Sequence, residues 1–316
     1  MSKQKKCFSN IGGQAVMEGI MMRNRDRMAT AVRKKDGTIA VKEEKTVPFK
    51  TKHKWAGWPV IRGSVALIES LIIGMKTLMW SSEQSLDEGD GNEPEKISGG
   101  AMTTTVVLAV LIAIGLFVVL PTVLSNFLRR FIDNYFLIAL IEGVLRLLIF
   151  IGYVLAVSSM KDVRRTFMYH GSEHKCINCL ESGLPLTVEN VMKSSKEHRR
   201  CGTSFLLFVM LISIVLFMFI RIDFLPLRIL SRILLIPVVA GLSYELIQFN
   251  GKFDNWFTYI LSRPGMWMQA LTTKEPTADM AEVTIAAVEK VFDWRAFLKD
   301  NFDVDVPAAV ESNPEE

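Results

Sequence analysis

Four long apolar blocks constrain this chain of 316 residues more than any other feature of its sequence. They lie at about 103–124, 135–157, 203–220 and 225–247. About 20 consecutive apolar residues suffice for a helix to cross the hydrocarbon core of a bilayer. Because the apolar residues are gathered in these blocks and not spread along the chain, we predict four membrane spans and not the core of a soluble domain.

The distribution of Lys and Arg predicts the orientation of the spans, since both residues are enriched in cytoplasmic segments. Of 37 such residues, 17 precede the first block, 8 lie within 158–202 and 6 follow residue 248. The two other connections between blocks hold Arg129, Arg130 and Arg221. The sequence therefore predicts a multi-pass protein in which both termini and the segment 158–202 are cytoplasmic.

The polar regions outside the blocks predict the rest of the architecture. In residues 1–57, Asp36-Gly37 between two short β-like runs is typical of a hairpin, so we expect a small β-rich N-terminal domain. Residues 83–100 are acidic and rich in glycine, as in a flexible linker. Residues 249–316 are expected to form a cytoplasmic interfacial and helical region with a disordered tail. The predicted fold class is a mainly α membrane protein with a four-helix membrane domain at 101–248.

Residues 58–82 are mostly apolar but carry Arg62, Glu69 and Lys76 at intervals of seven residues. Charges are costly inside a bilayer, and this spacing gathers them near one face of a helix. The segment therefore predicts an amphipathic helix at the membrane surface and not a further span.

Two of the predicted spans contain charged residues. Glu142 and Arg146 lie four residues apart in the second block, and Arg228 and Arg232 repeat this spacing in the fourth. A charge at this depth is costly unless it is paired or hydrated. One interpretation is structural: Glu142 pairs with Arg146 and with Arg232 and fixes how the helices dock. The alternative is a hydrophilic path, as an intramembrane enzyme or a transporter needs.

The segment 158–202 holds three of the four histidines of the chain, in the run His170-Gly171-Ser172-Glu173-His174 and at His198. In a helix, residues four apart share one face, so the first two histidines could bind one metal ion. Glu173 beside them would polarise a water molecule. The order H-x-x-E-H occurs in one class of zinc peptidases. The alternative is a solvated polar face without a metal.

Two arrangements of ligands are compatible with this segment. In the first, Glu245, near the cytoplasmic end of the fourth block, completes a histidine site that keeps an open position, as hydrolytic zinc sites do. In the second, Cys176 and Cys179 join His198 and Cys201 in a closed structural site. The last two residues could also join the first site. The metal would be divalent, either zinc or else manganese or iron.

Arg199 and Arg200 precede Cys201 at the start of the third block, which Thr203 or Ser204 would cap. A helix N-terminus beside two arginines attracts anions and favours the thiolate form of a cysteine. The simpler interpretation is a capped helix with the basic flank that is typical of cytoplasmic segments.

Four sequence blocks together resemble one bacterial membrane-protein family, domain of unknown function 1385. The blocks are GGQAVMEGIMMR at 12–23, YHGSEHK at 169–175, RCGTSF at 200–205 and YE at 244–245. The resemblance covers nearly the whole chain, from about Ile11 to Leu271. The family is labelled a predicted metal-dependent enzyme, so the resemblance implies metal dependence and a location in a bacterial plasma membrane.

Carried onto this sequence, the resemblance implies a polar centre made of residues from all four blocks. Its members are Glu18, Arg23, His170, Glu173, His174, His198, Cys201 and Glu245. In the family the positions of Cys176 and Cys179 need not both be cysteine, which favours the first arrangement of ligands over the closed site.

The site residues predict a hydrolase at the cytoplasmic membrane face that acts on a peptide or a lipid-linked substrate. Glu173 would be the general base, and Arg23 and Arg200 would stabilise negative charge, with Glu18 also supplied by the N-terminal domain. The alternative is a non-enzymatic module in the lipid bilayer that binds or regulates a larger membrane complex for secretion, insertion or quality control. A transporter is a third interpretation. No feature indicates nucleic-acid binding.

Overall fold

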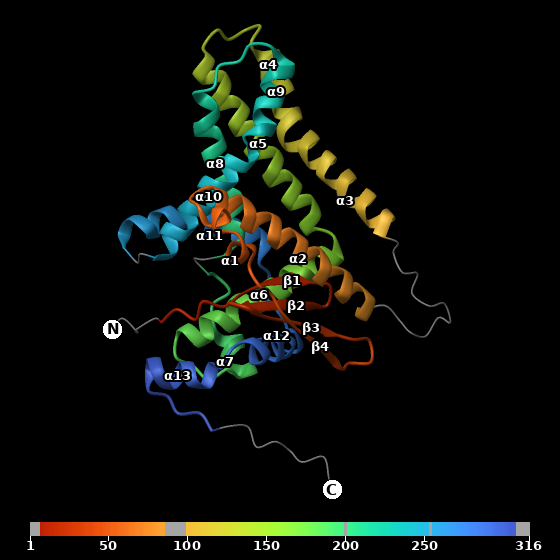
Figure 1. Ribbon diagram of the computed structural model, residues 1–316, viewed down its shortest axis with the longest axis vertical. Helices are drawn as coiled ribbons and strands as arrows, with labels where there is room; N and C mark the ends of the chain where they lie inside the picture. Colours follow the sequence, from red (N-terminus) through yellow and green to blue (C-terminus); the bar gives the residue numbers. More distant parts are fainter. Residues whose placement is uncertain (1–6, 86–98, 199–200, 253–254, 308–316) are drawn as a thin grey trace.

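The computed structural model describes residues 7–85, 99–198, 201–252 and 255–307 (Figure 1). Its strands are β1 (Gly12–Val16), β2 (Gly19–Asn24), β3 (Arg27–Arg33) and β4 (Ile39–Lys45). Its helices up to the histidine segment are α1 (Phe49–Lys52), the 3-10 turn η1 (Lys54–Gly57), α2 (Ile61–Ser85), α3 (Gly99–Ile114), the π-helical turn η3 (Gly115–Val119), α4 (Leu120–Leu128), α5 (Tyr135–Ser158) and α6 (Lys161–Glu181). The later helices are α7 (Val188–Lys193), α8 (Thr203–Met218), α9 (Leu225–Leu234), α10 (Ile236–Lys252), α11 (Trp256–Thr272), α12 (Ala278–Val291) and α13 (Trp294–Phe302).

The molecule has two ends of different character. A small sheet with helices packed around it forms one end, and a bundle of apolar helices forms the other (Figure 1). Most of the linker expected at 83–100, namely residues 86–98, lies outside the described residues. The end of the chain where the tail is expected, residues 308–316, lies outside them as well.

The N-terminal region forms a four-stranded antiparallel sheet in the order β1-β2-β3-β4. The turn between β3 and β4 contains Asp36-Gly37, as predicted, and Gly37 has a φ of +87° that suits glycine. The predicted fold class is therefore confirmed in its coarse form, a mainly helical protein with a small antiparallel sheet near its N-terminus.

Alternate residues of the sheet face opposite sides. On one side, Ile20 and Met22 pack with α6 and α12 in the main hydrophobic core. On the other side lies α2, whose Glu69 is 3.7 Å from Arg23 of β2. The sheet is therefore enclosed between helices from distant parts of the chain.

Three helices are long and apolar enough to cross a membrane. They are α2, α5 and the continuous helix Thr103–Leu128, which combines most of α3 with η3 and α4. The number rises to four if α9 and α10, which bend by 41° relative to each other, form one span. The helix α8 is apolar but has only 16 residues. These helices are compatible with a membrane location.

The placement of α2 at the membrane surface stays a prediction, because its length and composition would also allow this helix to cross a membrane. The helix runs obliquely between the sheet and the bundle (Figure 1). Its buried positions hold small residues, including Gly63 and Gly74, whereas Ile68 and Leu71 are exposed. The helix therefore packs closely on one side and presents an apolar face on the other.

Proline accounts for two irregular helices of the bundle. Pro121 has no N–H to donate to the carbonyl of Phe117, where the chain forms a π-helical turn. This carbonyl accepts instead from Arg146 Nε at 2.9 Å. Pro237 likewise lies next to the bend between α9 and α10.

Three charged residues of the bundle, Glu142, Arg146 and Arg232, pair with one another, which confirms the structural interpretation of Glu142. This carboxylate, 2% exposed, lies 3.2 Å from Arg146 Nη2 and 3.3 Å from Arg232 Nε. The hydroxyls of Thr122 and Ser125 also donate to it. The cluster joins α4, α5 and α9 through hydrogen bonds that are strong in an apolar environment.

Candidate metal centre

The histidine segment forms a helix, α6, that carries His170 and His174 one turn apart with ring centroids separated by 4.4 Å. His170 Nδ1 lies 2.9 Å from the carbonyl oxygen of Thr272, and His174 Nδ1 lies 2.7 Å from that of Lys196. Because a carbonyl oxygen only accepts, both Nδ1 atoms donate. In the neutral imidazoles the two Nε2 lone pairs are then available to a metal ion.

Cys201 adds a third donor from the short segment before α8. Its Sγ is 3.1 Å from His170 Nε2, and one donor atom each from His170, His174 and Cys201 lies within 4.8 Å of the other two. With Zn–N bonds of about 2.0–2.1 Å and a Zn–S bond of about 2.3 Å, tetrahedral geometry separates such donors by roughly 3.3–3.6 Å. The three side chains therefore fit a divalent metal such as zinc, with one tetrahedral position left over.

The ionisation of Cys201 also suits a metal ligand. Burial raises the pKa of its thiol, but hydrogen bonds to His170 and His174 outweigh burial and lower this pKa to about 5. Burial lowers the pKa of His170, whereas its hydrogen bond to Cys201 raises it to about 9. The backbone nitrogen and the hydroxyl of Thr203 lie 3.4 and 2.9 Å from the sulfur. The thiolate, which is the form that binds metals, is therefore favoured at neutral pH.

Glu173 occupies the helix position before His174 and contacts the N-terminal sheet. The backbone N–H of Gly13 in β1 donates to Glu173 Oε1 at 2.7 Å. Burial raises the pKa of this carboxyl, although His170 and the Gly13 hydrogen bond act in the opposite direction. A Cβ at position 13 would lie 2.6 Å from the carbonyl oxygen of Met21, so this close approach depends on glycine.

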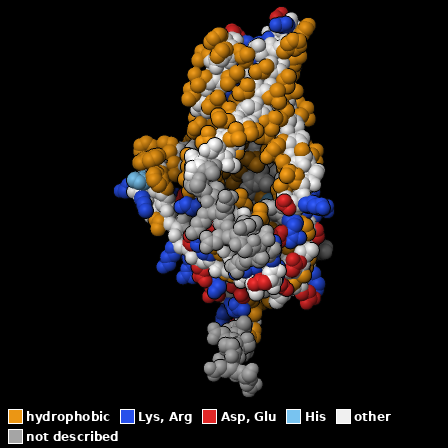
Figure 2. Space-filling view, turned by 90° about the vertical axis from the view of Figure 1, so that its right-hand side faces the viewer, with side chains coloured by type: hydrophobic (Ala, Val, Ile, Leu, Met, Phe, Trp, Pro, Cys, Tyr) orange, Lys and Arg blue, Asp and Glu red, His pale blue; other side chains and the backbone are white. Residues whose placement is uncertain are grey.

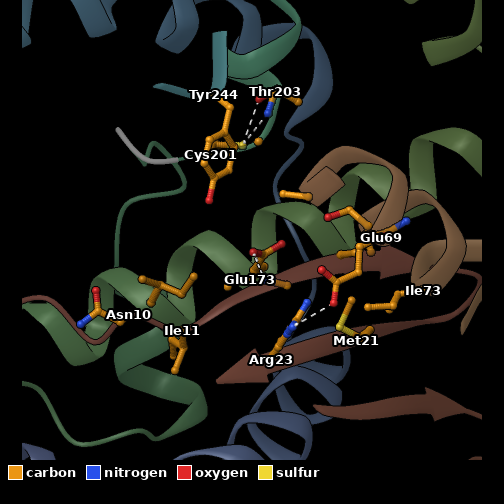
Figure 3. A pocket seen from close by; sticks show the side chains of 18 of the residues that line it. Asn10, Ile11, Met21, Arg23, Glu69, Ile73, Glu173, Cys201, Thr203 and Tyr244 are labelled. Atoms are coloured by element: carbon orange, nitrogen blue, oxygen red, sulfur yellow. Dashed lines mark hydrogen bonds and ion pairs between the residues drawn. The ribbon is translucent and has the colours of Figure 1, made fainter. Parts of the chain in front are cut away.

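These side chains line a cavity of about 1170 Å³ between the sheet, α2, α6 and α10. Glu173 lies between Cys201 and Arg23, and the hydroxyl of Tyr244 points toward it from the far wall (Figure 3). Apolar residues such as Ile73 line the side formed by α2. The cavity is large enough for an organic substrate with polar and apolar parts.

His198 lies beside the three donors but is not one of them. Its ring centroid is 5.6 Å from that of His174, and its Nε2 is 3.8 Å from Glu181 Oε2. The side chain of Gln269 accepts from the His198 N–H and donates to the His198 carbonyl. Glu181 also accepts from the N–H and hydroxyl of Ser9. Glu181 and Gln269 are not among the residues predicted for the centre, although Glu181 follows His174 by two helical turns on the same face.

Two residues predicted for the centre are engaged elsewhere. Glu245 accepts from Arg62 of α2, with Oε1 2.6 Å from Nε, so the structure does not bring it to the histidines. Glu18, at the turn between β1 and β2, pairs with Arg165 of α6. Both carboxylates therefore join secondary-structure elements and do not contribute to the group of donors.

The structure describes one of the two arginines that were predicted to stabilise negative charge. Arg23 lines the cavity at the end away from Cys201 (Figure 3). Arg200, like Arg199, lies outside the described residues. The predicted cap by Thr203 or Ser204 is wrong, because Gly202 is the N-cap of α8 and no side chain caps this helix.

The alternative closed site would need Cys176 and Cys179, and both are buried in the main hydrophobic core. Burial raises the pKa of both thiols, to about 11 for Cys179. Neither cysteine belongs to the group of possible metal donors found in the described part of the chain. Both are packed as small apolar residues.

We expect Gly171→Ala to disturb the centre although Gly171 is not a ligand. A Cβ at this position would lie 2.0 Å from the carbonyl oxygen of Lys274, two residues after Thr272. Relief of this overlap would shift the carbonyl that holds His170, so we expect the free energy of unfolding to fall by about 1–3 kcal/mol. Thermal unfolding of the purified variant measures this effect.

The matched control is Gly152→Ala in α5, where an added Cβ has no atom within 4 Å. This change should be neutral or slightly stabilising, because alanine favours a helix more than glycine does. Equal stability of the two variants would mean that the contact between α6 and the segment after α11 does not support the centre.

The fold and the site define a mainly helical protein with long apolar helices and a His/Cys cluster at a cavity beside a small sheet. The chain belongs to the family described as protein of unknown function (DUF1385), whose model matches residues 58–294. It is 36% identical over 303 residues to the uncharacterized protein YqhQ of Bacillus subtilis (strain 168), a similarity that covers 92% of this chain and 94% of that protein. No solved structure gives a significant match. Membership of the family that the sequence resembles is thus confirmed, whereas these matches do not support the label of a metal-dependent enzyme.

Proposed function

We propose that this protein is a metal-dependent hydrolase of the bacterial plasma membrane, with a divalent ion, in the first instance zinc, held by His170, His174 and Cys201. The observation that carries the proposal is the convergence of these three donors at a cavity, with both imidazoles oriented by backbone carbonyls. Such contacts set the tautomer and raise the basicity of ligating histidines. Three protein donors also leave a position for substrate, which distinguishes catalytic zinc sites from closed structural ones.

When bound, the metal would supply Lewis acidity toward a carbonyl or phosphoryl oxygen in the cavity. Glu173, oriented by the Gly13 N–H, would accept a proton from the attacking water and return it to the leaving group. Arg23 at the cavity wall would stabilise negative charge that develops on the substrate. Glu18 acts as a positioning residue, because its pair with Arg165 holds the β1–β2 turn on α6.

The lining of the cavity supports a peptide or lipid-linked substrate. Polar groups lie near the three donors, and apolar residues such as Ile73 of α2 and Ile11, which precedes β1, lie farther along the wall. The helix α2 borders the cavity on one side and exposes Ile68 and Leu71 on the other. A substrate with an apolar tail could therefore enter along this helix from the bilayer.

The distribution of side chains over the surface supports the membrane location. Hydrophobic side chains cover the bundle end, whereas charged side chains gather around the sheet end (Figure 2). We place the bundle in the bilayer and the sheet end, with both termini and the candidate centre, on the cytoplasmic side, because cytoplasmic segments are enriched in Lys and Arg.

The variant Glu173→Gln tests the proposal. Glutamine keeps the size of the side chain and can still accept from Gly13, so the variant should bind metal as the wild type does. It cannot take up a proton, so we expect its activity to fall by about 100-fold or more. Complementation of a strain that lacks its own copy of the gene measures function, and elemental analysis measures bound metal.

Two further variants separate the outcomes of this experiment. Cys201→Ser should lose both metal and function, and Glu69→Gln, which changes another carboxylate of the same cavity, should keep both. If Glu173→Gln complements fully while Cys201→Ser fails, the metal is structural. A module that docks on a membrane complex would then explain the protein better than a hydrolase.

A further inference from the structure

The apolar bundle buries more arginines than carboxylates. Arg146, Arg228 and Arg232 are all buried, and Glu142 is the buried carboxylate that faces them in the described part of the bundle. A guanidinium group stays charged in proteins. The bundle therefore carries an excess of positive charge in a place where a charge without a counter-ion is costly.

Arg146 is accounted for by its contacts, and Arg232 in part. Arg146 donates to Glu142, to the Phe117 carbonyl and to a serine hydroxyl of α8. Arg232 donates to Glu142, and its guanidinium lies 4.0 Å from the centroid of the Phe217 ring, whereas its buried Nη1 has no acceptor among the described residues.

Arg228 is not satisfied in this way. Its side chain is 1% exposed, and its Nη2 donates to the Thr122 carbonyl at 3.0 Å and to Asn126 Oδ1 at 3.2 Å. Neither Nε nor Nη1 of Arg228 has an acceptor among the described residues. Both atoms are buried, and an unpaired N–H on a charged group is among the costliest groups to bury.

Arg129, one helical turn after Asn126, also has a buried nitrogen without an acceptor in the described structure. This atom is Nη2, whereas Nη1 lies 2.9 Å from Asp223, whose side chain is 95% exposed. Asn126, which accepts from Arg228, lies one helical turn before Arg129 at the end of α4, so the two arginines are neighbours. Two neighbouring guanidinium groups thus carry unused donors where the end of α4 meets the start of α9.

This junction lies at the end of the bundle away from the sheet (Figure 1). Large aromatic side chains are exposed there, among them Phe131, Phe219 and Phe224. Arginines near the ends of membrane helices extend to the interface with the headgroups. In the proposed membrane location, this end of the bundle would lie near the phosphate groups of lipids.

We propose that Arg129 and Arg228 bind a phosphate oxyanion between α4 and α9, either the phosphate of a lipid headgroup or free inorganic phosphate. A guanidinium presents paired N–H groups that match two oxygens of a phosphate. One such anion would supply acceptors for Arg228 Nε and Nη1 and for Arg129 Nη2, and would separate the two like charges. This site lies in the bundle and is independent of the proposed hydrolase centre.

The test uses the full-length protein in a neutral detergent, with binding measured by native mass spectrometry and by the shift of the thermal unfolding midpoint. The probes are phosphatidylglycerol, diacylglycerol without a phosphate, and sodium phosphate. Arg129→Gln, at the rim of the site, and Arg228→Gln should each weaken binding of the phosphate-bearing probe at least tenfold, whereas Arg228→Lys, which keeps the charge, should lose less.

The matched control is Arg221→Gln, which removes an exposed arginine at the same end of the bundle, stacked on Tyr135 and Phe136. It should bind as the wild type does. Preference for phosphatidylglycerol over sodium phosphate would identify a lipid as the source of the anion, and equal stabilisation by sodium phosphate would identify the free ion. The proposal is overturned if diacylglycerol binds as well as phosphatidylglycerol and sodium phosphate has no effect, or if Arg129→Gln binds as tightly as Arg221→Gln.

Discussion

Replacement of Glu142 by leucine should lower the free energy of unfolding by about 3–5 kcal/mol, because loss of one partner from a buried ion pair leaves the other charge uncompensated. Here one carboxylate serves two guanidinium groups, those of Arg146 and Arg232, and two hydroxyls. The leucine side chain would fill the space but would leave both arginines without an anion. Chemical or thermal unfolding in detergent micelles measures the loss.

A comparison pair lies at the cavity wall, where Glu69 is 3.7 Å from Arg23 and both side chains are partly exposed. Glu69→Ala should cost less than about 1 kcal/mol, since water screens such pairs. A second variant that removes Arg146 and Arg232 together with Glu142, replacing all three by apolar residues, should recover much of the stability. Stability of Glu142→Leu equal to that of Glu69→Ala would show that the cluster does not hold the bundle together.

The second large effect should follow removal of the metal. The three donors join α6 to the segment that leads into α8. The two histidines among them are also held by hydrogen bonds that their Nδ1 atoms donate to the carbonyls of Thr272 in α11 and Lys196. A ligand that binds only the folded state stabilises it by RT ln(1 + [L]/Kd), about 4 kcal/mol when the free ion is at 1,000 times its Kd. A strong chelator should therefore lower the thermal unfolding midpoint of the wild type.

Variants that lack the ligands show whether this shift arises at the proposed centre. The double variant His170→Ala/His174→Ala should unfold near the midpoint of the chelated wild type and should not respond to chelator. A similar chelator effect in this variant and in the wild type would place the metal elsewhere in the protein.

The parts of the site that could be predicted from the sequence depend on local periodicity. His170 and His174 were predicted to share a face because residues four apart do so in any α-helix. Both residues lie in α6, which is an α-helix. The Asp36-Gly37 hairpin was predicted for a similar reason, since a short connection between two strands that contains glycine imposes its own backbone geometry. Both predictions needed no knowledge of how distant elements pack.

The third donor of the cluster could not be predicted in this way. Glu245 and Cys201 were both candidates, and the choice depends on long-range contacts. The packing of α10 on α2 gives Glu245 a partner in Arg62, and the chain before α8 folds back so that Cys201 reaches His170. Neither contact has a signal in the spacing of residues along the sequence.

Bound metal, measured by elemental analysis of the freshly purified full-length protein, tests the central claim most directly. The comparison is between the wild type, Cys201→Ser and the control Cys176→Ser, a buried cysteine outside the group of donors. The account predicts about one divalent metal ion per chain in the wild type and the control, and a large loss in Cys201→Ser. Metal lost from Cys176→Ser but kept in Cys201→Ser, or no metal in the wild type even after titration with zinc, manganese and iron, would contradict it.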